Sequence, residues 1–353
     1  MQSHIKYARI SAAGAVVQSI ESLLPLPFPG IKPGFANVFT LVSLIRFGKR
    51  DAFYIGLLRV IAGAIIIGTI FTPSFLMSLA GFLVSFPVSV FMLWLSRFNL
   101  GYGLVTISVM SAIFHNIGQL FVAGIIIIRG PEIFQLAPLL MLSSCFGGLL
   151  TGIFSHLVLS DLKNGKYNYI KKDNNDDNLF LSQKKLPKVI TILSLIILLV
   201  IMCFFIIVKS AFLLAGGALI ISFLLLVINF KSFFKTLKGI SFLLSIFFIL
   251  SILFYQYGTV IFSTGKILIT KEGIFRGILI VSRLAGLTFS GRLYLSVIPV
   301  ASLFDLFGKK NSVFISDLFI VLNSAYFFRN EIKENLKKRK ISLIKFVSDL
   351  FRD

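Results

Sequence analysis

The sequence predicts an all-α polytopic membrane protein with about ten transmembrane helices. Of its 353 residues, 57% are hydrophobic and the mean hydropathy is +0.94, whereas soluble domains contain roughly 45–50% apolar residues. Apolar runs of about 20 residues recur along the chain, and an α-helix of that length crosses about 30 Å of hydrocarbon. The predicted spans are residues 8–24, 36–47, 52–71, 75–95, 104–128, 134–158, 189–208, 211–230, 239–262 and 273–298.

The formal charge of +21 follows the expected topology of a membrane protein and does not indicate nucleic-acid binding. The basic residues fall in alternate short loops and in the carboxyl-terminal tail, whereas Lys32 and Arg129 are the basic residues of the intervening loops over the first half of the chain. By the positive-inside rule, the basic loops and both termini are cytoplasmic. We therefore expect a multi-pass protein of a bacterial cytoplasmic membrane, in contact with lipid and not with nucleic acid.

One long polar segment divides the chain. Residues 163–185, "KNGKYNYIKKDNNDDNLFLSQKK", are rich in Asn and Lys and separate six predicted spans from four. We expect a membrane domain over residues 1–160, a cytoplasmic linker over 161–186 and a second membrane domain over 187–300. Residues 301–353 alternate charged and apolar residues at helical spacing and predict basic cytoplasmic helices near the membrane surface or on a partner.

A rigid polar elbow follows the first span. The stretch "ESLLPLPFPGIKPGFAN", residues 21–37, carries four prolines and two glycines between apolar runs. Irregular backbone at membrane depth is tolerated where protein or a water-filled cavity satisfies its polar groups. This pattern predicts an outward-facing pocket near Glu21, Lys32, Gly34 and Asn37, and the alternative is an ordinary loop with a stiff turn.

Polar side chains within other spans extend this hypothesis. Arg59 lies inside the third span, where its permanent charge needs a carboxylate, carbonyl groups or an anionic ligand, and Glu21 is the first partner to test. His115, Asn116 and Gln119 lie together in the fifth span. Such residues indicate a functional site by default, although hydrogen bonds between helices are the alternative for these three.

Small residues repeat along the first span. Ala8 and Ala12 are four residues apart, and Ser11 and Ala15 repeat that spacing. Small residues at this spacing let a second helix approach closely in lipid, so we expect Ala8, Ala12 and Ala15 to form a helix interface.

The sequence does not indicate an enzyme. The aspartates of residues 173–177 lie in the Asn-rich linker, whereas a magnesium site needs carboxylates held on a scaffold. Paired Asp-rich motifs on helices are absent from the sequence, as is a nucleotide-binding P-loop. We expect no catalytic residues, no metal site and no cofactor.

Several of these motifs, in this order, resemble one known family. The elbow at 21–37, "LLRV" at 57–60, "SLAG" at 78–81 and "HNIGQL" at 115–120 are similar to the Gx transporter family, also described as heptaprenyl diphosphate synthase component I. That family looks related to the substrate-binding S components of energy-coupling factor (ECF) transporters. The resemblance implies a six-helix, S-component-like domain that captures a small molecule, with substrate-binding positions at Glu21, Lys32, Gly34, Asn37, Arg59, His115, Asn116 and Gln119.

The remainder of the chain resembles the T component of the same transporters more weakly. Residues 270–291, "TKEGIFRGILIVSRLAGLTFSG", are similar to that family's fourth span, and residues 329–340, "RNEIKENLKKRK", to the start of its coupling helices. The resemblance implies ATPase-coupling roles for Arg329 and Arg339. Arg339 stands in Lys338-Arg339-Lys340, where that family has Ala-Arg-Gly.

Together these resemblances imply two modules, one that captures the substrate and one reduced T-like scaffold of four helices. The chain would import a small vitamin-like or isoprenoid-related molecule with separate ABC-type ATPase subunits. The component I description implies an alternative, a non-catalytic membrane subunit of heptaprenyl diphosphate or quinone biosynthesis. A plain membrane anchor is the third possibility.

Overall fold

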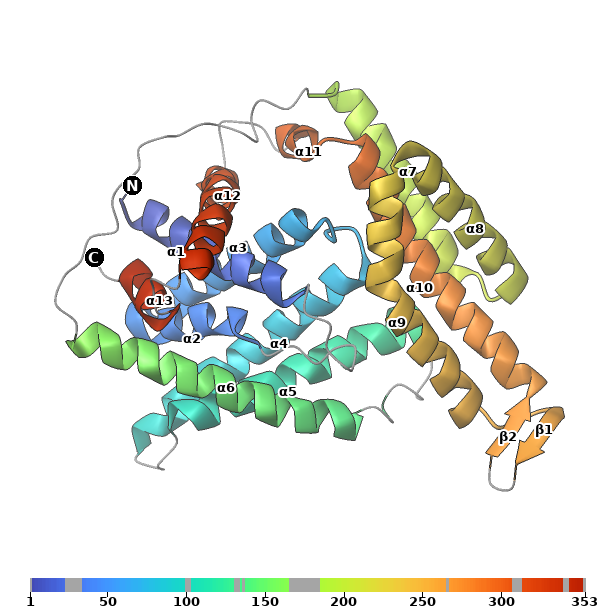
Figure 1. The fold of residues 1–353 in the computed structure, drawn as a ribbon, viewed down its shortest axis with the longest axis horizontal. Helices are drawn as coiled ribbons and strands as arrows, with labels where there is room; N and C mark the ends of the chain where they lie inside the picture. The colour runs from blue at the N-terminus through green and yellow to red at the C-terminus, as the bar shows by residue number, and fades with distance from the viewer. Residues whose placement is uncertain are drawn as a thin grey trace.

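The computed structural model describes residues 2–22, 34–98, 103–129, 134, 137–164, 185–264, 267–306, 313–338 and 343–351. Figure 1 shows a nearly all-helical molecule. The first half contains α1 (Gln2–Glu21), α2 (Ala36–Phe47), α3 (Lys49–Ile67), α4 (Pro73–Leu95), the 3-10 turn η1 (Ser96–Phe98), α5 (Leu104–Ala123), the π-helical turn η2 (Gly124–Ile128) and α6 (Ala137–Asn164). The rest contains α7 (Lys188–Ile207), α8 (Ala211–Ile228), α9 (Phe230–Phe254), β1 (Val260–Thr264), β2 (Ile267–Thr270), α10 (Lys271–Val297), α11 (Val300–Leu306), α12 (Val313–Lys338) and α13 (Leu343–Phe351).

The predicted all-α polytopic membrane fold is confirmed. Among the described residues, seven helices, α4 to α10, are long and apolar enough to cross a membrane. The first three predicted spans also form helices, but they are less suited to lipid. The twelve residues of α2 extend about 18 Å at 1.5 Å per residue, and α3 begins with three charged residues and contains Arg59. These three helices lie among protein neighbours, as the following contacts show.

The ninth predicted span was wrong at its carboxyl end. We expected a helix over residues 239–262, but α9 begins at Phe230 and ends at Phe254, and β1 pairs with β2 in an antiparallel hairpin. Gly258, with φ of +107°, breaks the helical path before β1. The β-branched and aromatic residues that follow favour a strand, and a short apolar run does not by itself distinguish a strand from a helix.

The hairpin is tied to the start of α10 by one threonine. Thr270 Oγ1 accepts a hydrogen bond from the Gly273 backbone N–H at 3.1 Å and donates one to the Tyr255 carbonyl at 2.9 Å. It therefore caps α10 and joins that helix to the chain that leaves α9.

The largest hydrophobic core lies in the first half of the chain and includes its carboxyl-terminal helices. Residues of α1, α2 and α3 pack there with the end of α6, the first part of α12 and α13. Figure 1 shows α12 and α13, in red, beside α1 and α2, in blue. Segments more than 300 residues apart thus form one core, and the first part of α12, which the sequence analysis assigned to the cytoplasm, lies against α1.

The two sets of membrane helices meet end to side. Because consecutive helices alternate in direction, residues 68–72 and 123–129 lie at the same end of the α1–α6 group. Leu120 and Ala123 pack with Ile280 and Leu284 of α10, whereas the ring of Phe71 packs against Tyr294, at 5.1 Å between centroids. Ile280 and Tyr294 are about 21 Å apart along α10 at 1.5 Å per residue. One end of the α1–α6 group therefore lies along the side of α10, and Figure 1 shows α4–α6 running toward the oblique α7–α10 group.

Candidate functional site

A buried arginine lies at the centre of the α1–α3 packing. Arg59 comes from the middle of α3 and is 3% exposed. Gly14 of α1 makes room for it, since a Cβ atom at that position would lie 2.7 Å from Arg59 Cδ. A glycine at this position therefore allows the arginine stem to cross the surface of α1.

The guanidinium group is bound by two amide side chains. Arg59 Nη2 donates to Asn37 Oδ1 at 3.0 Å, and Nη1 donates to Gln18 Oε1 at 3.3 Å. Arg59 Nε is buried and has no hydrogen-bond partner among the described residues. Buried polar atoms are nearly always paired with protein or water, so this nitrogen marks a position at which an acceptor would be stabilised.

Glu21 connects the same cluster to the start of α2. Its carboxylate is 5% exposed and accepts hydrogen bonds from the backbone N–H groups of Phe35, at 2.6 Å, and Ala36, at 3.5 Å. These are among the first N–H groups of the helix, which lack partners within it, and a negative charge is favoured at that end. The negative charge of Glu21 also acts electrostatically on Arg59, whose hydrogen bonds described above go to Gln18 and Asn37. We call Gln18, Glu21, Asn37 and Arg59 the Arg59 cluster.

The end of the elbow is held on α6. Gly34 has φ of +80°, a left-handed conformation that glycine adopts without strain. Its carbonyl accepts hydrogen bonds from Thr151 Oγ1 of α6 at 3.2 Å and from the Asn37 backbone N–H at 2.8 Å. Lys32, predicted to face the same pocket, lies outside the described residues.

The three polar residues of α5 lie at two different helix interfaces. His115 Nε2 lies 3.0 Å from Gln119 Nε2, and its ring packs on Gly81 of α4, where a Cβ atom would be 2.7 Å away. Asn116 Nδ2 instead donates to Ser144 Oγ at 2.6 Å and to the Leu140 carbonyl at 3.0 Å, both on α6. The Asn116 contacts are those of the alternative interpretation, hydrogen bonds between helices, whereas the Arg59 cluster lies among α1, α2 and α3.

Gln18 was missed by the sequence analysis. It lies three residues before Glu21 on α1, so the two side chains share a helix face. Its amide packs against Gly63 of α3, where an added Cβ atom would lie 2.9 Å from Gln18 Cδ. Gln18 could have been found from the sequence, because it is a polar residue inside the first predicted span and lies one helical turn from Glu21.

The alanines of α1 lie in the core that contains α12. Ala8, Ala12 and Ala15 have no exposed surface, and they belong to the same hydrophobic cluster as Leu318 and Leu322 of α12. His4 lies four residues before Ala8, on the same helix face, and contacts α12 directly.

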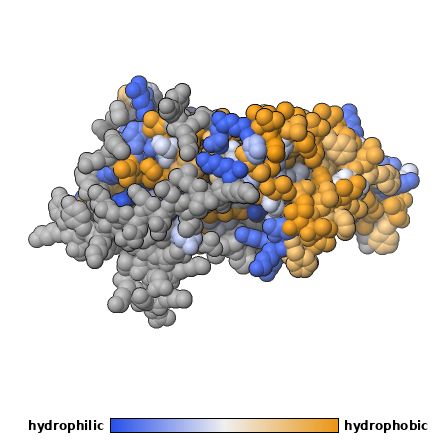
Figure 2. All heavy atoms as spheres, turned by 90° about the horizontal axis from the view of Figure 1, so that it is seen from above, coloured by the Kyte–Doolittle hydropathy of each residue, from blue (hydrophilic) through white to orange (hydrophobic). Residues whose placement is uncertain are grey.

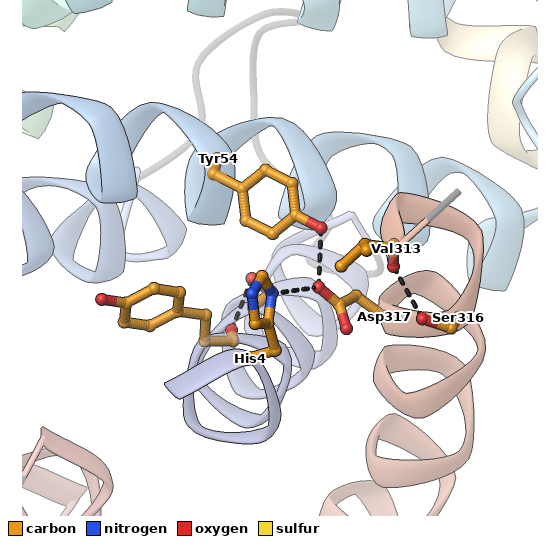
Figure 3. A network of polar contacts seen from close by, with 7 residues as sticks. His4, Tyr54, Val313, Ser316 and Asp317 are labelled. Atoms are coloured by element: carbon orange, nitrogen blue, oxygen red, sulfur yellow. Dashed lines mark hydrogen bonds and ion pairs between the residues drawn. The ribbon is translucent and has the colours of Figure 1, made fainter. Parts of the chain in front are cut away.

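Asp317 of α12 anchors this contact, and the sequence analysis missed it too. Its carboxylate is 2% exposed; Oδ2 lies 3.0 Å from His4 Nδ1 and accepts a hydrogen bond from Tyr54 OH at 2.6 Å. Figure 3 shows these side chains converging from α1, α3 and α12. Of the predicted coupling residues, Arg329 lies farther along α12, and Arg339 lies outside the described residues.

One comparison with known proteins concerns this part of the chain. Residues 10–158 match the model of the family heptaprenyl diphosphate synthase component I. The match begins within α1 and ends within α6, and it includes the whole Arg59 cluster and the polar residues of α5. No curated protein and no solved structure matches the chain. Within the described residues, no three His, Cys, Asp or Glu side chains are grouped as they would be to hold a metal ion.

Proposed function

We propose that this chain is a membrane transport subunit whose first six helices bind a small molecule at the Arg59 cluster. The observation that carries the proposal is Arg59 itself, a permanent cation that is 3% exposed and whose buried Nε has no acceptor among the described residues. A charge inside a membrane domain is costly and is a functional hypothesis by default. A substrate carboxylate or carbonyl oxygen would complete the hydrogen bonds of this guanidinium.

The end-to-side contact between the two helix groups supports a mechanism in which they rotate against each other. Helix groups with differently directed axes do not both stand upright in one bilayer, so reorientation of one against the other would change which side its pocket faces. Alternating access by rigid-body rocking works in this way. The first group would be the S-component-like module, and α7–α10 the reduced T-like scaffold.

Helix α12 is suited to transmit motion between a cytoplasmic partner and the binding module. Its first part packs against α1 through Asp317 and Leu318, and its second part carries Arg329 in a basic sequence. We propose that separate ABC-type ATPase subunits bind near Arg329 and Arg339, that both termini are cytoplasmic and that the membrane is a bacterial inner membrane. The substrate would be a vitamin-like or isoprenoid-related molecule.

A second function is favoured by the family match over residues 10–158. The chain would then be a non-catalytic membrane subunit that supports heptaprenyl diphosphate synthesis, and the Arg59 cluster would have a structural role. This function requires a catalytic partner subunit, whereas the transport function requires ATPases.

Purification of the full chain from native membranes separates the two functions. Transport predicts that ATPase subunits and a small molecule purify with it, and that Arg339→Glu releases the ATPases. The matched control is Lys231→Glu, a charge change at the start of α9. Recovery of a prenyl diphosphate synthase subunit without ATPases would overturn the transport proposal, and equal ATPase recovery with Arg339→Glu would exclude that residue from docking.

A further inference from the structure

A cationic cavity lies where the α7–α10 group meets Arg129 of the first group. It has a volume of about 650 Å³ and is lined by Arg129, Lys209, Arg276 and Arg283, together with one carboxylate, Glu272. Pockets of about 300–1,000 Å³ are the size that holds small ligands. This cavity contains none of the Arg59 cluster and lies outside the part of the chain matched by the family, except for Arg129.

Two of the four cations have a structural role at the end of α7. Arg283, which is 2% exposed, donates from Nε to the Phe205 carbonyl at 2.9 Å and from Nη2 to the Val208 carbonyl at 3.1 Å. Arg129 Nη1 donates to the Ile206 carbonyl at 2.6 Å. The last carbonyl groups of a helix lack partners within it and favour cations, so these contacts account for Arg129 and Arg283.

The backbone of Arg129 has an unusual conformation. Its φ is +53°, the one positive value outside glycine among the described residues. Left-handed backbone is unfavourable for a residue with a side chain and tends to occur at functional positions. This conformation brings a residue of the first helix group to the end of α7.

The other two cations of the lining are Lys209 and Arg276. Arg276 lies over the ring of Tyr255, at 4.9 Å from its centroid, and Lys209 is exposed where the chain leaves α7. Both Arg129 and Arg276 repel the charge of Arg283. The cavity therefore gathers like charges at a cost that a bound anion would remove.

Glu272, the one carboxylate of the lining, bonds to Thr259, the residue before β1. Glu272 Oε2 accepts a hydrogen bond from the Thr259 backbone N–H at 2.8 Å, and the Thr259 hydroxyl lies 3.3 Å from each carboxylate oxygen. Glu272 thus secures the chain before β1, and one carboxylate stands against four cations. The cavity has a positive field of the kind that concentrates anions.

The other wall of the cavity is apolar and continues onto the exposed apolar surface of α8. Phe212, Phe275 and Leu279 line it, and the rings of Phe212 and Phe275 lie 5.7 Å apart. Phe212 is 75% exposed, and Leu219 and Ile220 farther along α8 are 70% and 64% exposed. Figure 2 shows hydrophobic side chains over most of the side occupied by the α7–α10 group. A ligand here would have its charge among the arginines and its apolar part against these side chains.

We propose that this cavity binds an amphiphile that carries a phosphate or diphosphate group. The planar guanidinium of Arg276 and the exposed ammonium of Lys209 are suited to bind phosphate oxygens, and the charges of Arg129 and Arg283 beside them would add to the attraction. Phe212, Phe275 and Leu279 would contact the chain of the amphiphile. A membrane phospholipid and a prenyl diphosphate share this chemistry. The site lies apart from the Arg59 cluster, so it stands or falls independently of the proposed transport function.

The test is ligand binding by the full chain purified in a nonionic detergent and followed by native mass spectrometry. The probes are phosphatidylglycerol, farnesyl diphosphate, inorganic diphosphate and, as a zwitterionic control, phosphatidylcholine. We expect at least one of the first two to bind more tightly than inorganic diphosphate and phosphatidylcholine, and competition between them identifies which source is preferred. Equal binding of phosphatidylcholine, or tighter binding of inorganic diphosphate, would overturn the proposal.

Variants assign the binding to the cavity. Lys209→Gln with Arg276→Gln removes two cations of the lining and keeps the contacts of Arg129 and Arg283 with the end of α7. We expect about tenfold weaker binding or more, as for loss of a charge-assisted hydrogen bond. The control Lys231→Gln changes an exposed lysine at the opposite end of the same helix group and leaves binding unchanged. If the double variant unfolds, Lys209→Gln alone is used, since that side chain is exposed. Wild-type affinity in a folded variant would contradict the site, and Arg59→Gln is expected to keep this binding.

Discussion

The Arg59 cluster and the cationic cavity place charged side chains in opposite surroundings. In the first, one arginine lies with two amide side chains and a nearby carboxylate, and the carboxylate also binds the start of a helix. In the second, four cations surround an open volume, and the one carboxylate of the lining faces the hairpin. The first site lacks one acceptor, at Arg59 Nε, among the described residues, whereas the second, as we propose, takes a negatively charged group from outside.

The two carboxylates give the largest expected contrast. Glu21→Ala removes the charge nearest Arg59 and leaves two N–H groups of α2 without an acceptor. We expect a loss of about 3 kcal/mol in the free energy of unfolding, since each buried polar group left without its partner costs about 1–3 kcal/mol. Glu272→Ala is the control, because that side chain is exposed although it bonds to Thr259, and it should change stability much less than Glu21→Ala. Equal effects in a denaturant titration would show that the two regions do not differ as described.

The contact between the two regions is tested next. In Gly291→Ala the new Cβ atom would overlap the Phe71 carbonyl oxygen of the first helix group, so the two groups must separate there. Overpacking of this kind costs about 1–3 kcal/mol. Gly239→Ala is the matched control, since it lies in α9 with nothing within 4 Å of its Cβ position, and it should stabilise by about 0.5–1 kcal/mol. Unfolding temperatures of both proteins would measure the difference, and a stable Gly291→Ala protein would contradict the end-to-side packing.

A smaller change in stability is expected where α12 packs on α1. Asp317→Ala leaves Tyr54 OH, a partly buried donor, without this acceptor and removes the contact with His4. Loss of such a partner should cost about 1–2 kcal/mol. Asp305→Ala is a suitable control, because its pairing with Lys185, at 3.5 Å, is partly exposed. Protease accessibility of α12 in both variants would report the outcome, and unchanged protection with Asp317→Ala would show that the carboxylate does not hold the helix.

The smallest effect is expected between α5 and α6. Ser144→Ala removes the 2.6 Å acceptor of Asn116 Nδ2 but keeps the Leu140 carbonyl as a partner. We expect a loss of about 0.5–1.5 kcal/mol and no loss of substrate binding, if Asn116 is a packing residue. A large loss of binding at normal stability would return Asn116 to the substrate site.

The helices were largely predictable from the sequence, and their partners were not. Apolar runs of about 20 residues predicted most of the helices, although the third predicted span, 52–71, ran past Gly68, whose left-handed backbone ends α3. The seat of α12 depends on a contact between His4 and Asp317, 313 residues apart, which no local pattern contains. The hairpin was missed because its apolar residues continue the run of α9.

For the Arg59 cluster, most of the residues were predictable from the sequence, and their neighbours were not. Glu21, Asn37 and Arg59 stood out as polar residues among apolar ones, and the structure brings them together. Gln18 carried the same signal one helical turn earlier, and the separation of His115 from Asn116 onto different interfaces depends on which faces α4 and α6 cover. The cationic cavity combines residues from four loops and helix ends, so its charges resembled ordinary topology signals in the sequence.

The most direct test of the central claim compares two arginines of the same helix. The full chain is purified with Arg59→Gln or with Arg50→Gln, an exposed residue at the start of α3, and the co-purifying small molecules are identified by mass spectrometry. Our account predicts that wild type and Arg50→Gln retain the same small molecule, and that folded Arg59→Gln loses it. Retention of that molecule by Arg59→Gln at the wild-type level would contradict the account.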